Sequence, residues 1–289
     1  RTAVSGSEVF AAIKGCGGRI LMRSPLLAWS LAALLAGAVT TTLADEIVSL
    51  ASGRLIDMSY PYNADTIYWP TEKGFEKTTG FEGMTDKGYY YSAYSVKTAE
   101  HGGTHLDAPI HFAEGRHTTD EVPLSQLIGA AVVIDVSAGA EANRNYLISV
   151  QDITTWESNH GRLPVASIVL FRTGYGKYWP DRKQYLGTER FGPEAVVKLR
   201  FPGISKEAAQ FLVDQRSISA VGIDTPSIDF GQSTHFEAHQ VLLGANIPAF
   251  ENIANLDQLP ATGASVIALP MKIEGGSGAP LRMVGIVPE

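Results

Sequence analysis

The sequence predicts a protein of the α/β class, because short apolar runs alternate with helical segments. The runs at 130–136, 167–171 and 218–224 are rich in apolar and β-branched residues and predict buried strands. A capping box, Ser-Val-Gln-Asp, opens a helix over 149–160, and a capping serine opens an amphipathic helix over 205–215. Strands and helices that alternate in this way indicate an α/β fold.

Shorter signals predict the remaining elements, and the length of the chain favours one domain. The polar, glycine-containing segment 71–87 predicts a mobile loop, and the polar segment 177–201 predicts a surface excursion. Further strands are expected at 54–61, 89–97, 264–269 and 281–287, with a short helical turn at 124–127 and a flexible glycine-rich turn at 275–278.

Composition limits the class of partner. The 289-residue chain has a formal net charge of -7 and no basic run, which argues against nucleic acid or an anionic membrane as partner. A small molecule is the expected ligand. The sole cysteine, Cys16, lies ahead of the expected mature chain, which therefore has no disulfide and no thiol nucleophile.

Residues 22–44 have the pattern of an export signal, with a basic start after Met22, an apolar middle and small residues up to Ala44. A membrane anchor is the alternative, but the apolar run is shorter than the roughly twenty residues that a span requires. We expect cleavage after Ala44, a mature domain over 45–289 and a periplasmic location. Residues 1–21 would then lie upstream of the true start and receive no fold.

The stretch His101-Gly-Gly-Thr-His-Leu-Asp-Ala-Pro-Ile-His-Phe112 is unusually rich in histidine. Its glycines and proline oppose a helix, so we expect an irregular turn that leads into an extended segment. There His105 and Asp107 would point the same way, while the glycines would let the backbone fold His101 towards them. Two imidazoles and a carboxylate suit a divalent ion of the zinc, manganese or iron class.

His111 lies just outside this cluster and is a candidate general base or acid, because imidazole titrates near neutral pH. The alternative interpretation is a set of buried histidines bonded to backbone carbonyls. Titratable groups at short spacing with few apolar neighbours suit a ligand loop better than a core segment. His117 follows a turn and is expected to be a solvated loop residue.

A second group of candidates follows further along the chain. Thr234 and Glu237 have the spacing of a capping box, so His235 and His239 would project from one face of a helix. Core packing plus surface exposure is the alternative, but the first cluster favours a second set of groups that face the metal. Gln240 points elsewhere by about 100° and ranks lower.

Three other side chains are candidates for the same pocket. Glu251 is a carboxylate in an apolar segment and requires a partner such as a metal ion or His239. Tyr68 and Trp69 stand beside a proline in a predicted loop, where they are equally well explained as packed covers or as walls of a pocket for a flat substrate.

These motifs together resemble the cyclase family of metal-dependent amidohydrolases, which includes bacterial kynurenine formamidases and isatin hydrolases. The resemblance rests on the 101–112 motif, on Gly-Ile-Asp-Thr-Pro-Ser at 222–227, and on His239 placed twelve residues ahead of Glu251-Asn252. It covers nearly all of the mature chain. Within the family, the segments 250–256 and 269–278 look more like isatin hydrolase.

The resemblance implies a swivelling β/β/α fold, a homodimer, and hydrolysis of an amide or lactam. His101, His105 and Asp107 match the metal ligands of the family, and His111 matches its catalytic histidine. His239 and Glu251 match positions that complete a second metal site in the formamidases. In an enzyme with a single manganese ion, these two residues would orient the substrate instead, with Gln240 as a weaker candidate for that role.

We therefore expect a manganese-dependent hydrolase, with zinc as the alternative ion, that opens isatin to isatinate through a metal-activated water. His111 would act as the general base, and His111 or His235 would protonate the leaving nitrogen. N-formylkynurenine or a dienelactone is the alternative substrate. A rival from another class is an exported metal- or solute-binding protein without turnover, and predicted export is a departure from the cytoplasmic formamidases.

Overall fold

A computed structural model describes residues 53–288 of the chain. The predicted leader at 22–44, the residues ahead of it and the predicted start of the mature domain at 45 lie outside the described residues. Within 53–288, no helix combines the length and the apolar character needed to cross a membrane.

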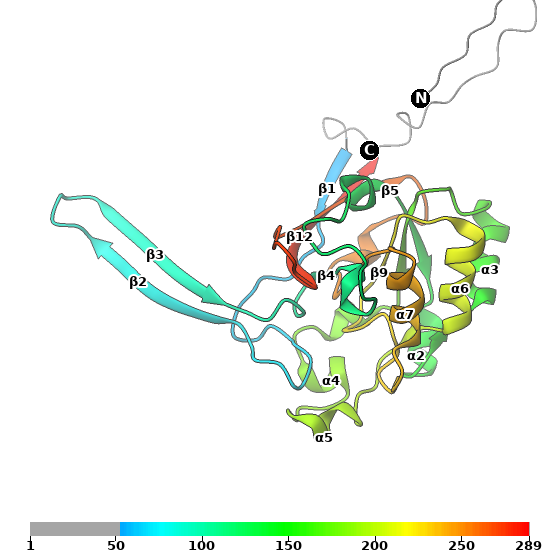
Figure 1. Cartoon of the computed structure of the whole chain (residues 1–289), viewed down its shortest axis with the longest axis horizontal. Helices are drawn as coiled ribbons and strands as arrows, with labels where there is room; N and C mark the ends of the chain where they lie inside the picture. The colour runs from blue at the N-terminus through cyan, green and yellow to red at the C-terminus, as the bar shows by residue number, and fades with distance from the viewer. Residues whose placement is uncertain (1–52, 289) are drawn as a thin grey trace, which may run out of the picture. The chain divides into compact units, whose positions relative to one another are not determined.

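A closed β-barrel forms the centre of the fold (Figure 1). Its strands follow the order β12-β11-β5-β7-β9-β10-β4, β4 pairs again with β12 to close the ring, and β1 pairs with the outer part of β12. The neighbours β5, β7, β9 and β10 are parallel, and the other pairs are antiparallel. The strands are β1 (Gly53–Asp57), β4 (His105–Asp107), β5 (Ile128–Asp135), β7 (Ile168–Arg172), β9 (Ala220–Ile223), β10 (Ala249–Glu251), β11 (Ala264–Pro270) and β12 (Gly278–Pro288).

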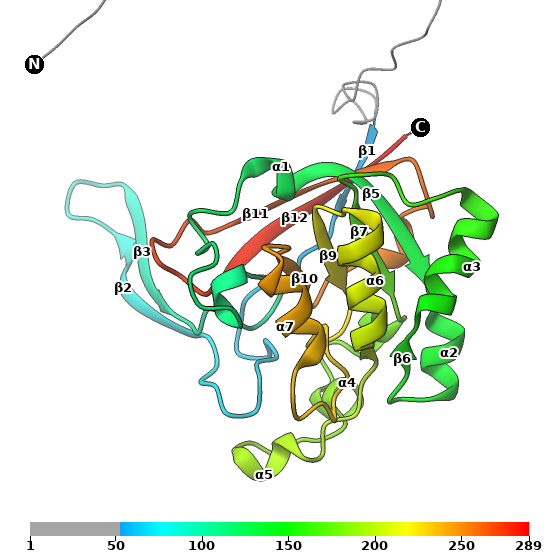
Figure 2. The ribbon, with the colours of Figure 1, turned by 45° about the vertical axis from the view of Figure 1, so that its right-hand side comes forward.

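Helices cover the outer face of the parallel strands (Figure 2). Val132 and Ile134 of β5 pack on this helical layer, whereas the alternating Ala131 and Val133 point into the barrel. Both faces of such a strand are buried, which explains the unbroken apolar runs in the sequence. This layer consists of α3 (Val150–His160), α6 (Lys206–Arg216) and α7 (Glu237–Gly244), whereas α1 (Leu124–Leu127) places Leu127 in the barrel cluster and α2 (Ser137–Ala142) places Ala140 in a smaller apolar cluster. The predicted α/β class is confirmed.

The two predicted helix starts are confirmed. Ser149 and Asp152 form a reciprocal capping box at the start of α3. The Ser205 hydroxyl accepts the backbone N–H of Ala208 and caps α6. These caps satisfy N–H groups that the first turn of a helix leaves without partners.

The segment 177–201 is not the surface excursion that its polarity predicted. Four of its side chains, Tyr185, Leu186, Leu199 and Phe201, are fully buried in an apolar cluster with Ile67 and Tyr175. They are scattered among charged residues without a period of two or of 3.6, so no regular pattern indicated their burial. The short elements of this region are β6 (Leu147–Ile148), η3 (Tyr175–Tyr178), α4 (Arg182–Leu186), α5 (Pro193–Val196) and β8 (Gly203–Ile204), and η4 (Leu256–Gln258) lies near the end of the chain.

The segment 71–87 is not a loop either. Glu76–Met84 forms strand β2, which pairs antiparallel with the predicted strand β3 (Tyr90–Lys97). We call this hairpin, residues 76–97, the arm, and it extends away from the barrel (Figure 1). Nearly all of its residues are exposed, so β2 has no buried face and no alternation of apolar and polar residues to predict it.

Candidate functional site

Strand β4 holds the centre of the site. His105 and Asp107 alternate with Leu106, so both polar side chains point to one side while Leu106 packs in the barrel core. The register of β4 and β10 places Glu251 directly opposite His105. Opposite residues on paired strands share a face, which brings the Glu251 carboxylate to the same point. All three polar side chains are buried.

His101 reaches this point from the turn that precedes β4. Its Nδ1 lies 2.6 Å from Asp107 Oδ1, and its Nε2 lies 2.9 Å from Ser277 Oγ. The Ser277 hydroxyl donates to Glu100 at 2.6 Å, so the proton between His101 and Ser277 belongs to His101 Nε2. In a neutral ring, Nδ1 then faces Asp107 with its lone pair. The predicted convergence of His101 with the residues of β4 is present.

His239 approaches Asp107 from the opposite side. Its Nε2 lies 3.1 Å from Asp107 Oδ2 and 3.3 Å from Glu251 Oε1. Its Nδ1 donates to Asp229 Oδ2 at 2.6 Å, and Asp229 also accepts the backbone N–H groups of Ala238 and His239. A carboxylate on the far nitrogen of a metal-binding histidine fixes its ring orientation and tautomer. Asp229 therefore positions His239.

The helix that carries His239 starts later than predicted. Phe236 has a left-handed backbone (φ 51°) and precedes the first residue of α7, Glu237. Asp229, nine residues ahead of Ala238, supplies the cap in place of Thr234. The predicted capping box of Thr234 and Glu237 is therefore wrong, because tertiary structure supplies a buried carboxylate to the same N–H groups.

This shift removes two candidates from the site. His235 precedes α7, is exposed, and does not line the pocket that holds His239. Gln240 is also exposed, and its side-chain amide donates to the His235 carbonyl. The prediction that His235 protonates a leaving group across the pocket is wrong, as is the role of Gln240 in orienting substrate. Phe236, which no sequence signal marked, occupies the pocket wall instead.

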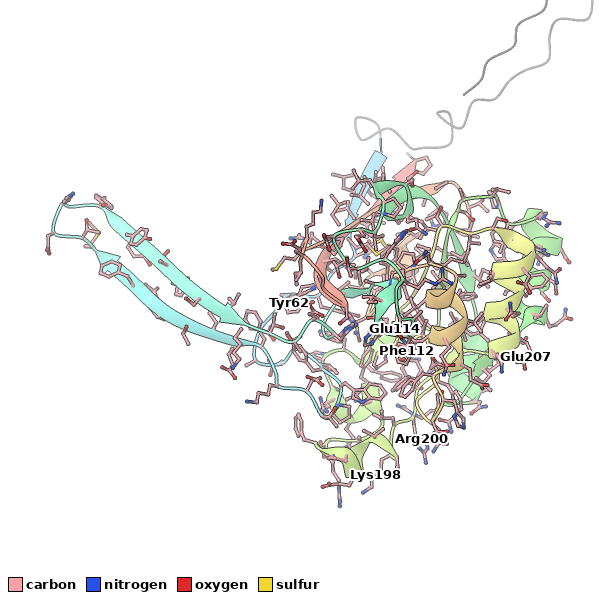
Figure 3. All side chains as sticks on the ribbon, in the orientation of Figure 1. Tyr62, Phe112, Glu114, Lys198, Arg200 and Glu207 are labelled. Atoms are coloured by element: carbon pink, nitrogen blue, oxygen red, sulfur yellow. The ribbon has the colours of Figure 1, made fainter. Side chains whose placement is uncertain are left out.

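A cavity of about 560 Å³ opens beside the polar cluster. Tyr68 is buried and its hydroxyl lies 2.6 Å from Thr98 Oγ1, while Trp69 meets Phe236 edge to face with ring centroids 6.1 Å apart. The cavity is lined by Tyr68, Trp69, His101, His105, Asp107, His111, Phe112, Phe236, His239 and Glu251, among others. Figure 3 labels Phe112 and, where the arm joins the barrel, Tyr62. The interpretation of Tyr68 and Trp69 as pocket walls is the one that the structure supports.

Gly102 is required for this wall. A Cβ at position 102 would lie 2.0 Å from Cδ1 of Tyr68, closer than any side chain tolerates. The neighbouring Gly103 has a positive φ of 57°, and a Cβ there would lie 2.7 Å from the Tyr62 ring. These glycines therefore let the two tyrosine rings lie against the backbone, and they also form the turn that the sequence predicted.

His111 ends the short helix η2 (Pro109–His111), and its ring stacks on His101 with centroids 3.8 Å apart and planes 20° apart. Burial lowers the pKa of His111 to about 4; the Asp107 charge opposes this effect, whereas His101 and His239 add to it. The ring is therefore neutral at neutral pH and can accept a proton. Its position in the pocket supports the predicted role of general base.

The donor atoms of the cluster fit a cation. Nδ1 of His105 donates to the Gly103 carbonyl at 2.9 Å, so Nε2 carries a lone pair in the neutral ring. This buried nitrogen makes no hydrogen bond and lies 3.1 Å from Asp107 Oδ1 and 3.5 Å from Glu251 Oε2. Burial opposes a charge on His105, but Asp107 and Glu251 outweigh it and raise its pKa, so either a proton on Nε2 or a metal cation must balance these carboxylates. Two groups, His101–Asp107–His111 and His105–Asp107–Glu251, bring their donor atoms within 4.8 Å of one another.

The charges in the cluster are strongly linked. Burial raises the pKa of Glu251, and the Asp107 charge adds to this effect. Burial also opposes ionisation of Asp107, but His101 and His105 prevail and hold the pKa of Asp107 well below its usual value. For His239, burial is outweighed by its hydrogen bonds to carboxylates, which raise its pKa well above the usual value. A divalent cation would compete with protons for these positions.

Asp229→Asn should weaken the binding of a divalent cation about 10- to 100-fold, because asparagine keeps one acceptor oxygen but loses the charge that orients His239. Calorimetric titration of the chelated protein with Mn²⁺ would measure this change. Asp135→Asn, an exposed carboxylate paired with Arg172, is the matched control and should leave the affinity unchanged. Equal affinity in the Asp229 variant and the parent protein would contradict the positioning role.

A closed barrel with outer helices, a buried cluster of His, Asp and Glu, and an adjoining aromatic cavity defines a metal-dependent hydrolase. Comparison with known proteins gives the family. The sequence profile of the family described as "Putative cyclase" matches residues 56–230. The chain belongs to the cyclase family, and the resemblance inferred from its motifs is confirmed.

Individual relatives agree with this assignment. The isatin hydrolase of Roseibium aggregatum is 33% identical over 198 residues, which cover 66% of this chain and 73% of the relative. The kynurenine formamidase of Salinibacter ruber is 33% identical over 230 residues, which cover 80% of this chain and 96% of the relative. Isatin hydrolase A from Labrenzia aggregata, solved with bound benzyl benzoate, has a TM-score of 0.74 at 34% identity and covers 83% of this chain and 95% of its own.

Sequence reasoning missed the residues that support the cluster. Asp229 contacts His239 from ten residues away, Ser277 contacts His101 from the far end of the chain, and Glu100 reaches His101 only through the Ser277 hydroxyl. None lies at a spacing that a local motif would reveal. A histidine that binds a metal needs a hydrogen-bond partner for its second ring nitrogen, so the sequence implies that such partners exist. It does not show which carboxylate or hydroxyl fills that role.

Proposed function

We propose that the protein hydrolyses the cyclic amide of isatin to give isatinate. The observation that carries this proposal is Nε2 of His105, a buried nitrogen without a hydrogen bond that faces Asp107 and Glu251 beside an aromatic cavity. Such a site calls for a cation, and the cavity between Trp69 and Phe236 suits a flat ring. Similarity to isatin hydrolases supports this choice of substrate.

His101, His105 and Asp107 would hold the ion, which we propose to be manganese, with zinc as the alternative because the same donors accept both. A divalent cation at this position supplies Lewis acidity to a carbonyl group and makes water a stronger acid. His111 takes the proton from the attacking water as a neutral base. As an imidazolium, the same ring then returns a proton to the leaving nitrogen, which completes ring opening.

Hydrolysis of N-formylkynurenine is the second candidate, and one observation favours it. His239 and Glu251 meet on the far side of Asp107, where they could complete a second cation site rather than orient a lactam. The similarity to a kynurenine formamidase spans nearly that whole protein. His101, His105 and Asp107 would hold a cation with either substrate. Turnover measurements must therefore separate the two candidates.

Chelation followed by the return of Mn²⁺ or Zn²⁺ tests the proposal, with isatin, N-formylkynurenine and a dienelactone as substrates. We expect chelation to abolish turnover, Mn²⁺ to restore it, and isatin to be opened fastest. Faster hydrolysis of N-formylkynurenine would favour the second candidate. Metal binding without turnover of any of the three would contradict a hydrolase and favour an exported solute-binding protein.

We further propose that residues 22–44 direct the chain to the periplasm, although they lie outside the described residues. The proposal rests on their basic, apolar and small-residue pattern alone. Mass spectrometry of the intact exported protein should find Asp45 as the first residue, and a chain that begins well before it would contradict cleavage. We also propose that the mature protein is a homodimer.

A further inference from the structure

The glycine-rich segment 275–278, which the sequence predicted as a flexible turn, packs against His101. β12 begins at Gly278, whose pairing partner on β4 is Asp107. A Cβ at position 278 would lie 2.5 Å from Cε1 of His101, closer than any side chain tolerates. Only glycine leaves room for the imidazole at this point. The segment therefore belongs to the surroundings of the candidate metal site.

Hydrogen bonds from residues that follow β4 hold this segment in place. The Ala108 N–H donates to the Ser277 carbonyl at 2.9 Å. The N–H and the hydroxyl of Thr119 both donate to the Gly276 carbonyl, at 2.9 and 3.0 Å. Two consecutive carbonyl groups are thus anchored ahead of β12. The backbone of Ser277 is therefore fixed relative to the turn that carries His101.

Both protons that Ser277 can donate go to one carboxylate oxygen. Its hydroxyl oxygen lies 2.6 Å and its backbone nitrogen 3.0 Å from Glu100 Oε2. An ionised carboxylate only accepts hydrogen bonds, so the Ser277 hydroxyl is the donor. The serine oxygen then offers only its lone pairs to His101 Nε2, which lies 2.9 Å away and must donate. Glu100 thus sets the direction of the hydrogen bond between Ser277 and His101.

We propose that Glu100 and Ser277 are positioning residues that select the nitrogen through which His101 binds the cation. With the proton held on Nε2, the neutral ring presents the lone pair of Nδ1, which lies 2.6 Å from Asp107 Oδ1. In the other tautomer Nδ1 carries the proton and cannot bind a cation. A partner on the far nitrogen of a metal-binding histidine fixes its tautomer and orientation. This role rests on the cation site of the proposed function.

His101 needs this arrangement because its orientation is the reverse of that of the other two histidines. His105 and His239 both face the carboxylates with Nε2 and donate through Nδ1 to an acceptor on the other side of the ring. His101 faces them with Nδ1, and its acceptor at Nε2 is Ser277. A serine hydroxyl can donate as well as accept, so it fixes no tautomer by itself. Glu100 removes that freedom by accepting the hydroxyl proton.

Calorimetric titration of the chelated protein with Zn²⁺ tests the role of Ser277. Ser277→Ala should raise the dissociation constant about 10- to 100-fold, because the far nitrogen of His101 loses its partner. Ser167→Ala is the matched control, since this serine also forms a hydrogen bond through its hydroxyl, but to the Pro164 carbonyl and not to a candidate metal ligand. Its affinity for Zn²⁺ should equal that of the parent protein. Circular dichroism would establish that both variants are folded.

Nitrogen-15 NMR of the histidine rings in the Zn²⁺-loaded protein tests which nitrogen binds. Nδ1 of His101 should have the chemical shift of a metal-bound nitrogen, and Nε2 should carry the proton. This proton should exchange slowly with water in the parent protein, and Ser277→Ala should lose this slow exchange because the hydrogen bond to the serine is gone. A His101 ring bound through Nε2 would overturn the proposal.

Glu100 lines the cavity, so a direct contact with the cation must be separated from an action through Ser277. Glu100→Gln should weaken Zn²⁺ binding about 10-fold, because an amide can turn either its oxygen or its nitrogen to the hydroxyl and no longer fixes the proton. In the Ser277→Ala background the same change should have no further effect. Glu121→Gln is the matched control and should leave the affinity unchanged, since that exposed carboxylate accepts the backbone N–H of Thr118.

Equal Zn²⁺ affinity of the Ser277 variant and the parent protein would overturn the inference. Losses that add in the double variant would also overturn it, because Glu100 would then act on the cation without Ser277. A parent protein that binds no Zn²⁺ would contradict the cation site of the proposed function, and with it the role of both residues. A parent protein that binds Zn²⁺ and opens isatin, with a Ser277 variant of unchanged affinity, would overturn this inference alone.

Discussion

Asp107→Asn should leave a folded protein that binds little divalent cation and loses at least about 100-fold in turnover. Asp107 contacts all sides of the cluster: one carboxylate oxygen faces His101 and His105, and the other faces His239. Asparagine has nearly the same shape but no charge, and its amide nitrogen cannot bind a cation. The expected loss exceeds that of a supporting residue such as Asp229, because Asp107 is a proposed direct ligand of the ion.

Metal content after dialysis, measured by plasma emission spectroscopy, is the direct readout for this variant, with turnover as the second. Asp214→Asn changes an exposed carboxylate on α6 and should retain full metal content and activity. Thermal unfolding of the chelated proteins would separate a loss of metal binding from a loss of fold. Stoichiometric metal in the Asp107 variant would show that the cation site lies elsewhere.

His111→Ala should retain the metal and lose about 10²- to 10⁴-fold in kcat, the usual effect of removing a general base. His111 stacks on His101 but forms no hydrogen bond to Asp107, so its removal leaves the principal donor atoms in place. In the proposed mechanism, its neutral ring at the pocket wall accepts the proton of the attacking water. Steady-state kinetics with isatin and metal analysis of the same preparation would measure both quantities.

His160→Ala provides the control for this second variant. His160 is an exposed histidine at the end of α3, its ring tilted by 36° against Trp156, and it does not line the cavity. Its replacement should change neither kcat nor metal content. Full activity of the His111 variant would remove the proposed base. Loss of metal from that variant would instead assign His111 to the cation, in agreement with the donor group that it forms with His101 and Asp107.

Local chemistry made much of the fold predictable. Strand β5 and its parallel neighbours are buried on both faces, so they appear in the sequence as continuous apolar runs. The caps Ser149 and Ser205 each act on an N–H group three residues further along the chain, which is within the reach of sequence patterns. The arm and the segment 177–201 escaped prediction, because neither has one regular buried face along its length.

The part of the candidate site formed by the 101–107 segment could also be predicted from local sequence. His101, His105 and Asp107 lie within one short turn and strand, and the alternation of side chains in β4 is sufficient to bring two of them together. The candidates on α7 were different. A capping box that looked valid in the sequence placed His235 on the helix, but the buried Asp229 caps the helix from outside and starts it at Glu237.

The sequence by itself determined that a histidine-rich turn before Asp107 converges on one point and that the chain is an α/β protein of the cyclase family. Only the tertiary structure decided which distant groups complete that point, because strand register brings Glu251 opposite His105 and a single carboxylate, Asp229, orients His239. The His105–Glu251 and Asp107–His239 contacts join residues more than a hundred positions apart in the sequence, and they depend on how strands pair and helices pack. No local spacing encodes them.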